Sequence, residues 1–160
     1  MGGAAALGAL GANDRVNIAV IGVGGRGRDH ITSIAKQPNA RVAAVCDVNQ
    51  AQSERAVALT EKVQNSKPKV YEDMRKLFED KDIDAVSIAT PNHWHALATI
   101  WACEAGKDVY CEKPACYNIW EGQRMVAAAR RNKRMVQIGM QSRSTEHKIR
   151  AVQLLKDGAI

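Results

Sequence analysis

Short apolar runs alternate with longer stretches of helical periodicity from Val16 onward, and this alternation restricts the fold more than any other feature of the chain. We expect strands at residues 16–21, 41–46, 69–71, 84–90, 108–111 and 135–138. Helices are expected at about 30–36, from Asn49, around Leu77, at about 92–105, from Asn118 and at 145–158. Six strands separated by helices require right-handed crossovers, so the sequence predicts an α/β fold with a doubly wound, mostly parallel sheet and helices on both faces.

Composition narrows the class of partner. The 160-residue chain has a net charge of +6, which favours an anionic partner. The basic residues are scattered apart from a cluster at 130–134, which is the expected end of a helix. Three Tyr, three Trp and one Phe offer little surface for base stacking. We therefore expect a phosphate-bearing small molecule rather than nucleic acid or a membrane.

The cysteines do not have the spacing of a zinc site or of a CxxC redox motif. They lie in or beside apolar segments, at Cys46, Cys103, Cys111 and Cys116. We expect them to be reduced and mostly buried.

The stretch from Val20 to Arg28, VIGVGGRGR, places four glycines in six residues directly after the first expected strand. Gly22, Gly24 and Gly27 fit G-x-G-x-x-G, in which one glycine allows a tight turn, one lets a pyrophosphate approach and one lets the helix pack on the strand. The start of the following helix would offer amide donors to that anion. The pattern alone is weak, and a turn that serves only packing is the alternative.

Asp47 strengthens the prediction of a dinucleotide site. It lies twenty residues beyond Gly27, at the end of the second expected strand, where an acid can accept hydrogen bonds from ribose hydroxyls. Its charge repels the extra phosphate of NADP, and no arginine follows it directly, so we expect NAD as the cofactor. The alternative is that Asp47 is a loop or cap residue beside a packing turn.

Two further loops at strand ends carry polar side chains. The stretch TPNHWH holds His93 and His95, but two histidines are too few for a zinc site, so we predict no metal and expect Asn92 to cap a helix. The stretch YCEKP places Lys113 at the end of the fifth strand, where it could hydrogen-bond a substrate hydroxyl and help to move its proton. A surface ion pair between Glu112 and Lys113 is the alternative.

Together, GVGGRG, CDV, TPNHWH, CEKP and GMQSR resemble the N-terminal domain of the Gfo/Idh/MocA oxidoreductase family from about Arg15 onward, and EKP is the most specific part. The resemblance implies a Rossmann fold that binds NAD, with Lys113 as the catalytic lysine and Glu112 at the nicotinamide-side ribose. The predicted cofactor-binding residues are Gly22, Gly24, Gly25, Arg26, Gly27, Asp47, Thr90, Asn92, His95, Glu112 and Gln141. The predicted substrate residues are Lys113 and Arg143.

The family normally continues into a second α/β domain that holds most substrate contacts. We therefore expect residues 1–13 to be a remnant of an export signal or a disordered extension, 14–143 to be the dinucleotide-binding domain, and 144–160 to be a helix leading into a substrate domain that this chain lacks. The first residues, MGGAAALGALGAN, resemble the apolar part of a twin-arginine export signal without its arginine pair. Periplasm and cytoplasm both stay open.

The resemblance implies an NAD-dependent oxidoreductase that acts on a hydroxyl carbon of a sugar, cyclitol or related polyol, and a homo-oligomer at full length. The alternatives are an NAD-dependent glycosidase of the same architecture and a non-catalytic module that senses dinucleotides. We expect the chain by itself to bind NAD and to turn over nothing, because catalysis needs a substrate held against the nicotinamide.

Overall fold

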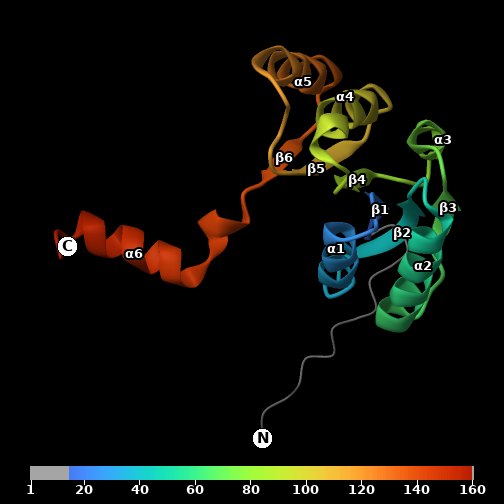
Figure 1. Cartoon of the computed structure of the whole chain (residues 1–160), viewed down its shortest axis with the longest axis horizontal. Helices are drawn as coiled ribbons and strands as arrows, with labels where there is room; N and C mark the ends of the chain where they lie inside the picture. Colours follow the sequence, from blue (N-terminus) through green and yellow to red (C-terminus); the bar gives the residue numbers. More distant parts are fainter. Residues whose placement is uncertain (1–14, 160) are drawn as a thin grey trace, which may run out of the picture.

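A computed structural model describes residues 15–159, in which six parallel strands form one sheet in the order β3-β2-β1-β4-β5-β6 (Figure 1). The strands are β1 (Val16–Ile21), β2 (Ala40–Cys46), β3 (Lys69–Tyr71), β4 (Ala85–Ile88), β5 (Asp108–Glu112) and β6 (Val136–Gly139). The helices are α1 (Arg26–Ile34), α2 (Gln50–Gln64), α3 (Met74–Glu79), α4 (His95–Glu104), α5 (Ile119–Asn132) and α6 (Glu146–Lys156), with short 3₁₀ turns η2 (Asn92–Trp94) and η3 (Gln141–Ser144).

This arrangement is the predicted doubly wound α/β fold. The predicted export remnant or extension at 1–13 lies outside the described residues. No helix within residues 15–159 is both long enough and apolar enough to span a membrane.

Two elements differ from the predicted bounds in a way that affects the site. Helix α1 begins at Arg26, four residues earlier than predicted, because Gly25 is its N-cap and Gly27 lies within its first turn. Strand β4 ends at Ile88 rather than Thr90, because the chain turns toward Pro91, which cannot donate a ladder hydrogen bond.

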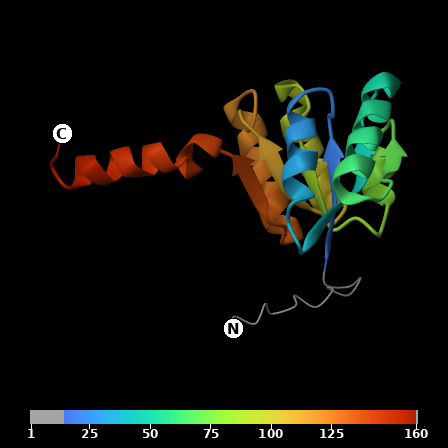
Figure 2. The ribbon, with the colours of Figure 1, turned by 90° about the horizontal axis from the view of Figure 1, so that it is seen from below.

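Alternate residues of β1 pack on opposite faces of the sheet, which is why the strands are apolar throughout. Ala19 and Ile21 belong to an apolar cluster with residues of α3, α4 and α5, including Leu77 and Ala102. Val20 belongs to a second cluster with residues of α1 and α2. The sheet is therefore covered by helices on both faces, as Figure 2 shows.

Asparagine side chains fix the start of two helices as the sequence predicts, whereas the predicted cap role of Asn92 is wrong, because Asn92 lies within η2 and neither η2 nor α4 has a side-chain cap. Asn49 accepts a hydrogen bond from the Ala51 N–H at 3.0 Å, and Asn118 accepts one from the Glu121 N–H at 2.9 Å. Gly106 ends the turn after α4 with a φ of +77°. The ends of these helices are thus determined by residues close to them in the sequence.

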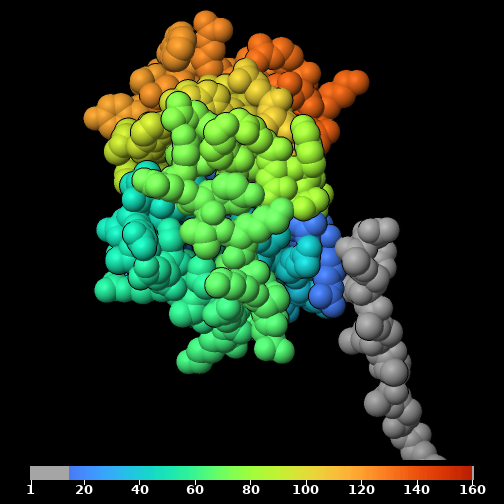
Figure 3. Space-filling view, turned by 90° about the vertical axis from the view of Figure 1, so that its right-hand side faces the viewer, coloured from blue at the N-terminus to red at the C-terminus, as the bar shows by residue number. Residues whose placement is uncertain are grey.

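The strand order reverses between β1 and β4, and the two halves of the chain meet there. Figure 3, seen from the side of β3 and α3, shows the first half in blue to green below and the second half in yellow to orange above. Helix α6 projects away from the sheet in Figures 1 and 2, and Ile149, Val152 and Leu155 on it are exposed. In sheets of this topology, ligands bind at the carboxyl ends of the strands beside the reversal point.

Candidate functional site

The glycine turn between β1 and α1 is shaped by two close approaches of backbone. Gly22 has a φ of +82°, and a Cβ there would lie 2.7 Å from the Thr90 nitrogen. A Cβ on Gly27 would lie 2.1 Å from the Gly22 carbonyl oxygen. Gly24 and Gly25 have room, since a Cβ would meet only the Gln52 side chain at 3.8 Å in the first case and nothing within 4 Å in the second.

The start of α1 is open to a ligand on the side of this turn. No side chain caps the helix at Gly25, so no side chain blocks its first amide groups, of which the Arg28 N–H donates to the Gly25 carbonyl at 3.0 Å. Uncapped amides at the positive end of a helix dipole suit a phosphate group. The residues present therefore fit the pyrophosphate of a dinucleotide.

The Asp47 side chain hydrogen-bonds both to the glycine turn after β1 and to the loop in which Asp47 itself lies. Its Oδ2 accepts a hydrogen bond from the Val23 N–H at 2.9 Å, and its Oδ1 accepts one from the Asn49 N–H at 2.9 Å. It lines a cavity of about 820 Å³ together with Val48, Thr90, Trp94 and other residues at the ends of β1, β2 and β4. Asp47 is thus placed for a ribose, and that role stays a prediction.

A second cavity of about 500 Å³ shares Thr90 with the first, so the two adjoin along the strand ends. Its lining residues are Arg26, Ala89, Thr90, Asn92, His95, Glu112, Lys113 and Gln141. All but Ala89 are residues that the sequence predicted for the site. Arg143 is exposed on η3 and is not among the lining residues, so its contact with substrate stays a prediction.

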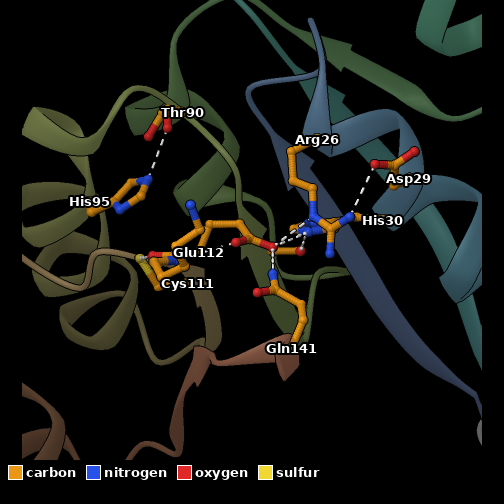
Figure 4. Close-up of polar contacts among 10 residues, drawn as sticks. Arg26, Asp29, His30, Thr90, His95, Cys111, Glu112 and Gln141 are labelled. Carbon is orange, nitrogen blue, oxygen red and sulfur yellow. Dashed lines mark hydrogen bonds and ion pairs between the residues drawn. The ribbon is translucent and has the colours of Figure 1, made fainter. Parts of the chain in front are cut away.

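Glu112 is the centre of a hydrogen-bond network in this second cavity (Figure 4). Its Oε1 accepts hydrogen bonds from Arg26 Nε at 3.0 Å, from His30 Nε2 at 2.9 Å and from the side-chain amide of Gln141. Its Oε2 accepts one from the backbone N–H of Lys113 at 3.3 Å. Burial alone raises the pKa of Glu112, but these donors outweigh it and hold the pKa at about 2.

The predicted alternative of a surface ion pair between Glu112 and Lys113 is wrong. Glu112 is 6% exposed; its side chain forms an ion pair with Arg26 and lies 2.9 Å from His30 Nε2, and it forms none with the Lys113 ammonium group within residues 15–159. Lys113 itself is exposed at the cavity, and within residues 15–159 its ammonium group has neither a hydrogen bond nor an ion pair. The two neighbours therefore have different roles, one buried in a network and one facing the cavity.

Sequence reasoning missed His30. This side chain is 7% exposed, and besides Glu112 its Nδ1 lies 2.8 Å from Ser87 Oγ, with its ring edge-on to Tyr110 at 5.4 Å between centroids. The available signal was its spacing of four residues from Arg26, which puts both on one face of a helix that starts at Gly25. The prediction started that helix at His30 and hid this signal.

His95 joins two loops of the cavity. It is 2% exposed, and its ring nitrogens lie 2.6 Å from the carbonyl oxygen of Pro114 and 2.9 Å from that of Thr90. The bond to Pro114 reaches the loop that carries Lys113, and the bond to Thr90 reaches the end of β4. The ring therefore contacts main chain, and contact with a cofactor stays a prediction.

Residues 15–159 contain no group of three or more His, Cys, Asp and Glu side chains that could hold a metal ion. The two histidines of the TPNHWH stretch lie in different elements, His93 in η2 and His95 in α4.

All four cysteines are free, and Cys46, Cys103 and Cys111 are buried, as the sequence predicts.

A family model described as an oxidoreductase family with an NAD-binding Rossmann fold matches residues 16–140. The chain belongs to the Gfo/Idh/MocA oxidoreductase family. The fingerprint glycines between β1 and α1 and the EKP loop after β5 lie within the matched residues, and the family is NAD-binding. The roles of individual site residues stay predictions.

Relatives and solved structures agree with this assignment. Inositol 2-dehydrogenase of Salmonella typhimurium is 34% identical over 143 residues, which is 88% of this chain and 41% of the relative. A glycosyl hydrolase family 109 protein of a Shewanella species is 36% identical over 125 residues, 76% of this chain and 27% of the relative. The scyllo-inositol dehydrogenase of Lactobacillus casei, solved with NAD(H) and scyllo-inositol, superposes with a TM-score of 0.81 at 28% identity, over 91% of this chain and 42% of that protein. The chain thus spans less than half of these proteins.

Proposed function

We propose that this chain forms the NAD-binding part of an oxidoreductase that oxidises or reduces a hydroxyl carbon of a sugar, cyclitol or related polyol. The observation that carries the proposal is the exposed Lys113 beside the buried, ionised Glu112, at a cavity on the carboxyl ends of the strands. Membership of an NAD-binding oxidoreductase family and similarity to inositol dehydrogenases support it.

The dinucleotide would lie across the two adjoining cavities. The first amides of α1 and the glycine turn would bind its pyrophosphate, and Asp47 would accept hydrogen bonds from the ribose hydroxyls on the adenine side. Glu112 would do the same for the ribose on the nicotinamide side. The nicotinamide, when bound, supplies the acceptor or donor of a hydride.

Lys113 would handle the proton. As the hydride leaves the substrate carbon, the hydroxyl on that carbon loses its proton to the lysine amine and becomes a carbonyl, and the reverse reaction returns the proton. Lys113 suits this role because its exposed side chain lines the cavity, and its amino group has no hydrogen bond or ion pair within residues 15–159. His95 and Glu112 hold the loop on either side of it.

The second candidate is an NAD-dependent glycosidase, favoured by the 36% identity to the Shewanella glycosyl hydrolase family 109 protein. Transient oxidation of a sugar hydroxyl to a carbonyl would acidify a neighbouring C–H. Loss of that proton would expel the aglycone and leave a double bond, to which water would add before the hydride returned to the carbonyl. The two reactions differ in their net outcome. NADH accumulates in a dehydrogenase reaction, whereas a glycosidase releases the aglycone without accumulating NADH.

The test is a fluorescence titration of the purified chain with NADH, followed by turnover measurements on a longer protein in which this chain is joined to a family substrate domain. We expect Lys113→Met to change NADH affinity less than about threefold and to lower turnover by a factor of about 100 to 10,000. Lys62→Met, on the exposed side of α2, is the matched control and should change neither. Failure of the wild-type chain to bind NADH would contradict the proposal, and normal turnover by Lys113→Met would make the lysine structural.

A further inference from the structure

His30 does not line the cavity that holds Lys113, yet it contacts Glu112, which among the described residues is the only carboxylate that lines it. It lies on α1, one helical turn after Arg26, and Glu112 lies 82 residues further along the chain at the end of β5. The contact between them is 2.9 Å long and buried on both sides, at 8% and 7% side-chain exposure. A buried contact of this kind fixes the orientation of a side chain more firmly than a surface ion pair does.

The donors around Glu112 are divided unequally between its two oxygens. Three side chains from two elements occupy Oε1: Arg26 and His30 from α1 and Gln141 from η3. Within residues 15–159, the only donor to Oε2 is the Lys113 backbone N–H, at a long 3.3 Å. A carboxylate oxygen can accept more than one hydrogen bond, so Oε2 keeps capacity for a ligand.

The Glu112 carboxylate determines that Nε2 of His30 carries a hydrogen, and the Ser87 hydroxyl is compatible with this assignment. Glu112 is ionised and can only accept, so the hydrogen must be on Nε2. The Ser87 hydroxyl, 2.8 Å from Nδ1, can then donate to that nitrogen's lone pair. In this arrangement the Ser87 hydroxyl donates to His30, and His30 donates to Glu112.

Ser87, His30 and Glu112 have the residue types of a hydrolytic triad, but their burial excludes that role. Ser87 is 4% exposed, so its hydroxyl cannot attack a substrate. The carboxylate, in turn, lies at the cavity rather than behind the histidine. In a hydrolytic triad the serine faces the substrate, whereas here the carboxylate does. Ser87 hydrogen-bonds to His30, and His30 in turn hydrogen-bonds to Glu112.

We propose that His30 is a positioning residue for Glu112, holding Oε1 so that Oε2 is free to accept a hydrogen bond from a ligand hydroxyl. The ligand is a polyhydroxylated molecule seated beside Lys113, and its identity as the dinucleotide rests on the proposed function. The charged or titratable groups that face Glu112 are Arg26, His30, Tyr110 and Lys113, while Gln141 is neutral.

The first experiment follows the Glu112 carboxyl carbon by ¹³C NMR from pH 8 down to about pH 1, a range that includes the low wild-type pKa of about 2, in the chain labelled at glutamate and with Glu112→Gln to assign the signal. We expect His30→Leu to raise the titration midpoint by about one to two pH units, since a hydrogen bond to a charged group is lost. Ser87→Ala should raise it less, and His30→Gln, which can still donate an N–H, should restore most of the wild-type value.

Thr60→Val is the control for loss of a buried hydrogen bond, because Thr60 is fully buried on α2 and bonds only to the Ala56 carbonyl in its own helix. It should leave the Glu112 midpoint unchanged. An equal midpoint in wild type and His30→Leu overturns the inference. If His30→Leu does not fold, Ser87→Ala decides in its place, and a wild-type midpoint in that variant overturns the inference.

The second experiment measures NADH affinity at pH 7 by fluorescence. We expect His30→Leu to weaken binding by about three- to tenfold and His30→Gln to recover it, with Thr60→Val unchanged. Unchanged NADH binding by His30→Leu overturns the part of the inference that concerns the ligand. Absence of NADH binding by the wild-type chain overturns the proposed function instead, and the carboxyl titration still decides whether His30 controls Glu112.

Discussion

The carboxylate of Asp47 accepts a hydrogen bond from the Val23 N–H at 2.9 Å, although the two residues are 24 positions apart. The contact joins the end of β2 to the glycine turn after β1. The group expected to bind the adenosine ribose and the loop expected to bind the pyrophosphate are therefore held at one fixed separation.

We expect the chain to bind NAD(H) more tightly than NADP(H), because the Asp47 charge repels a phosphate on the ribose. Asp47→Ser should narrow this preference and should also weaken NAD binding, since it removes the ribose contact and the bond to Val23. Calorimetric titration with both cofactors measures the ratio. Glu54→Gln, an exposed charge removed on α2, should keep the wild-type ratio. Tighter binding of NADP than of NAD by the wild type would contradict the assignment of Asp47.

Gly27→Ala should destabilise the fold by about 1–3 kcal/mol or more, because the new Cβ would lie 2.1 Å from the Gly22 carbonyl oxygen and the turn must move. Gly25→Ala is the matched control, since nothing lies within 4 Å of its Cβ. Urea unfolding of both variants measures the difference. Equal stability of the two would mean that the helix packs less tightly on the turn than described.

The stability of the chain should depend on Glu112 in a way set by pH. The pKa of Glu112 is about 2 in the folded chain and ordinarily 4.5, so ionised Glu112 contributes stability above about pH 4.5 and loses this contribution as the pH falls toward 2. The free energy of unfolding of Glu112→Gln should therefore lie below that of wild type at pH 7, and the difference should shrink below about pH 4.5 and be mostly lost near pH 2. Chemical denaturation at several pH values measures the difference in unfolding free energy between wild type and Glu112→Gln. The other acidic residues are the same in both proteins, so their pH-dependent contributions cancel in this difference. A constant difference would contradict the low pKa.

Cys116 should react first with a thiol reagent. Cys46 and Cys111 are buried, and burial raises the pKa of their thiols to about 12 and about 11, so little thiolate forms at pH 8. Cys116 is only half-buried. Mass spectrometry after brief treatment with iodoacetamide should find one modified cysteine, and Cys116→Ser should abolish the fast reaction. Rapid modification of Cys111 would indicate that β5 opens.

Self-association of the chain should depend on α6. Ile149, Val152 and Leu155 are 57%, 51% and 59% exposed on this helix, and apolar side chains in a row favour contact between copies. Light scattering should show a mass that rises with concentration, and Val152→Glu should reduce it. Arg150→Glu, which changes charge without removing apolar surface, is the comparison. A constant monomer mass for wild type would contradict this expectation.

Local signals explain why much of the fold could be predicted. Apolar runs gave the strands, and Asn49 and Asn118 marked two helix starts because capping depends on residues only two or three positions away. The spacing of Gly22 and Gly27 likewise describes a turn within a few residues. Family resemblance then added the residues around Lys113, which no local pattern could have assigned.

The network around Glu112 could not be predicted, because it depends on strand order. Arg26 and His30 lie 86 and 82 residues before Glu112, and they meet it only because β4 and β5 follow β1 in the sheet. In the sequence, adjacent acidic and basic residues at 112 and 113 resemble a surface pair. Burial of one and exposure of the other follow from tertiary structure alone.

The reversal of strand order also sets when the site can form during folding. Strand β1 pairs with β4, and the Asn17 N–H donates to the Asp84 carboxylate across 67 residues of chain. Contacts this far apart in sequence require closing a long loop and slow the folding of a chain. Helices and caps of either half can form before that closure, but the donors on α1 cannot reach Glu112 until it is complete. During refolding, the rate at which ligand binding recovers should therefore equal the rate at which β1 pairs with β4. It should not follow the faster formation of the helices.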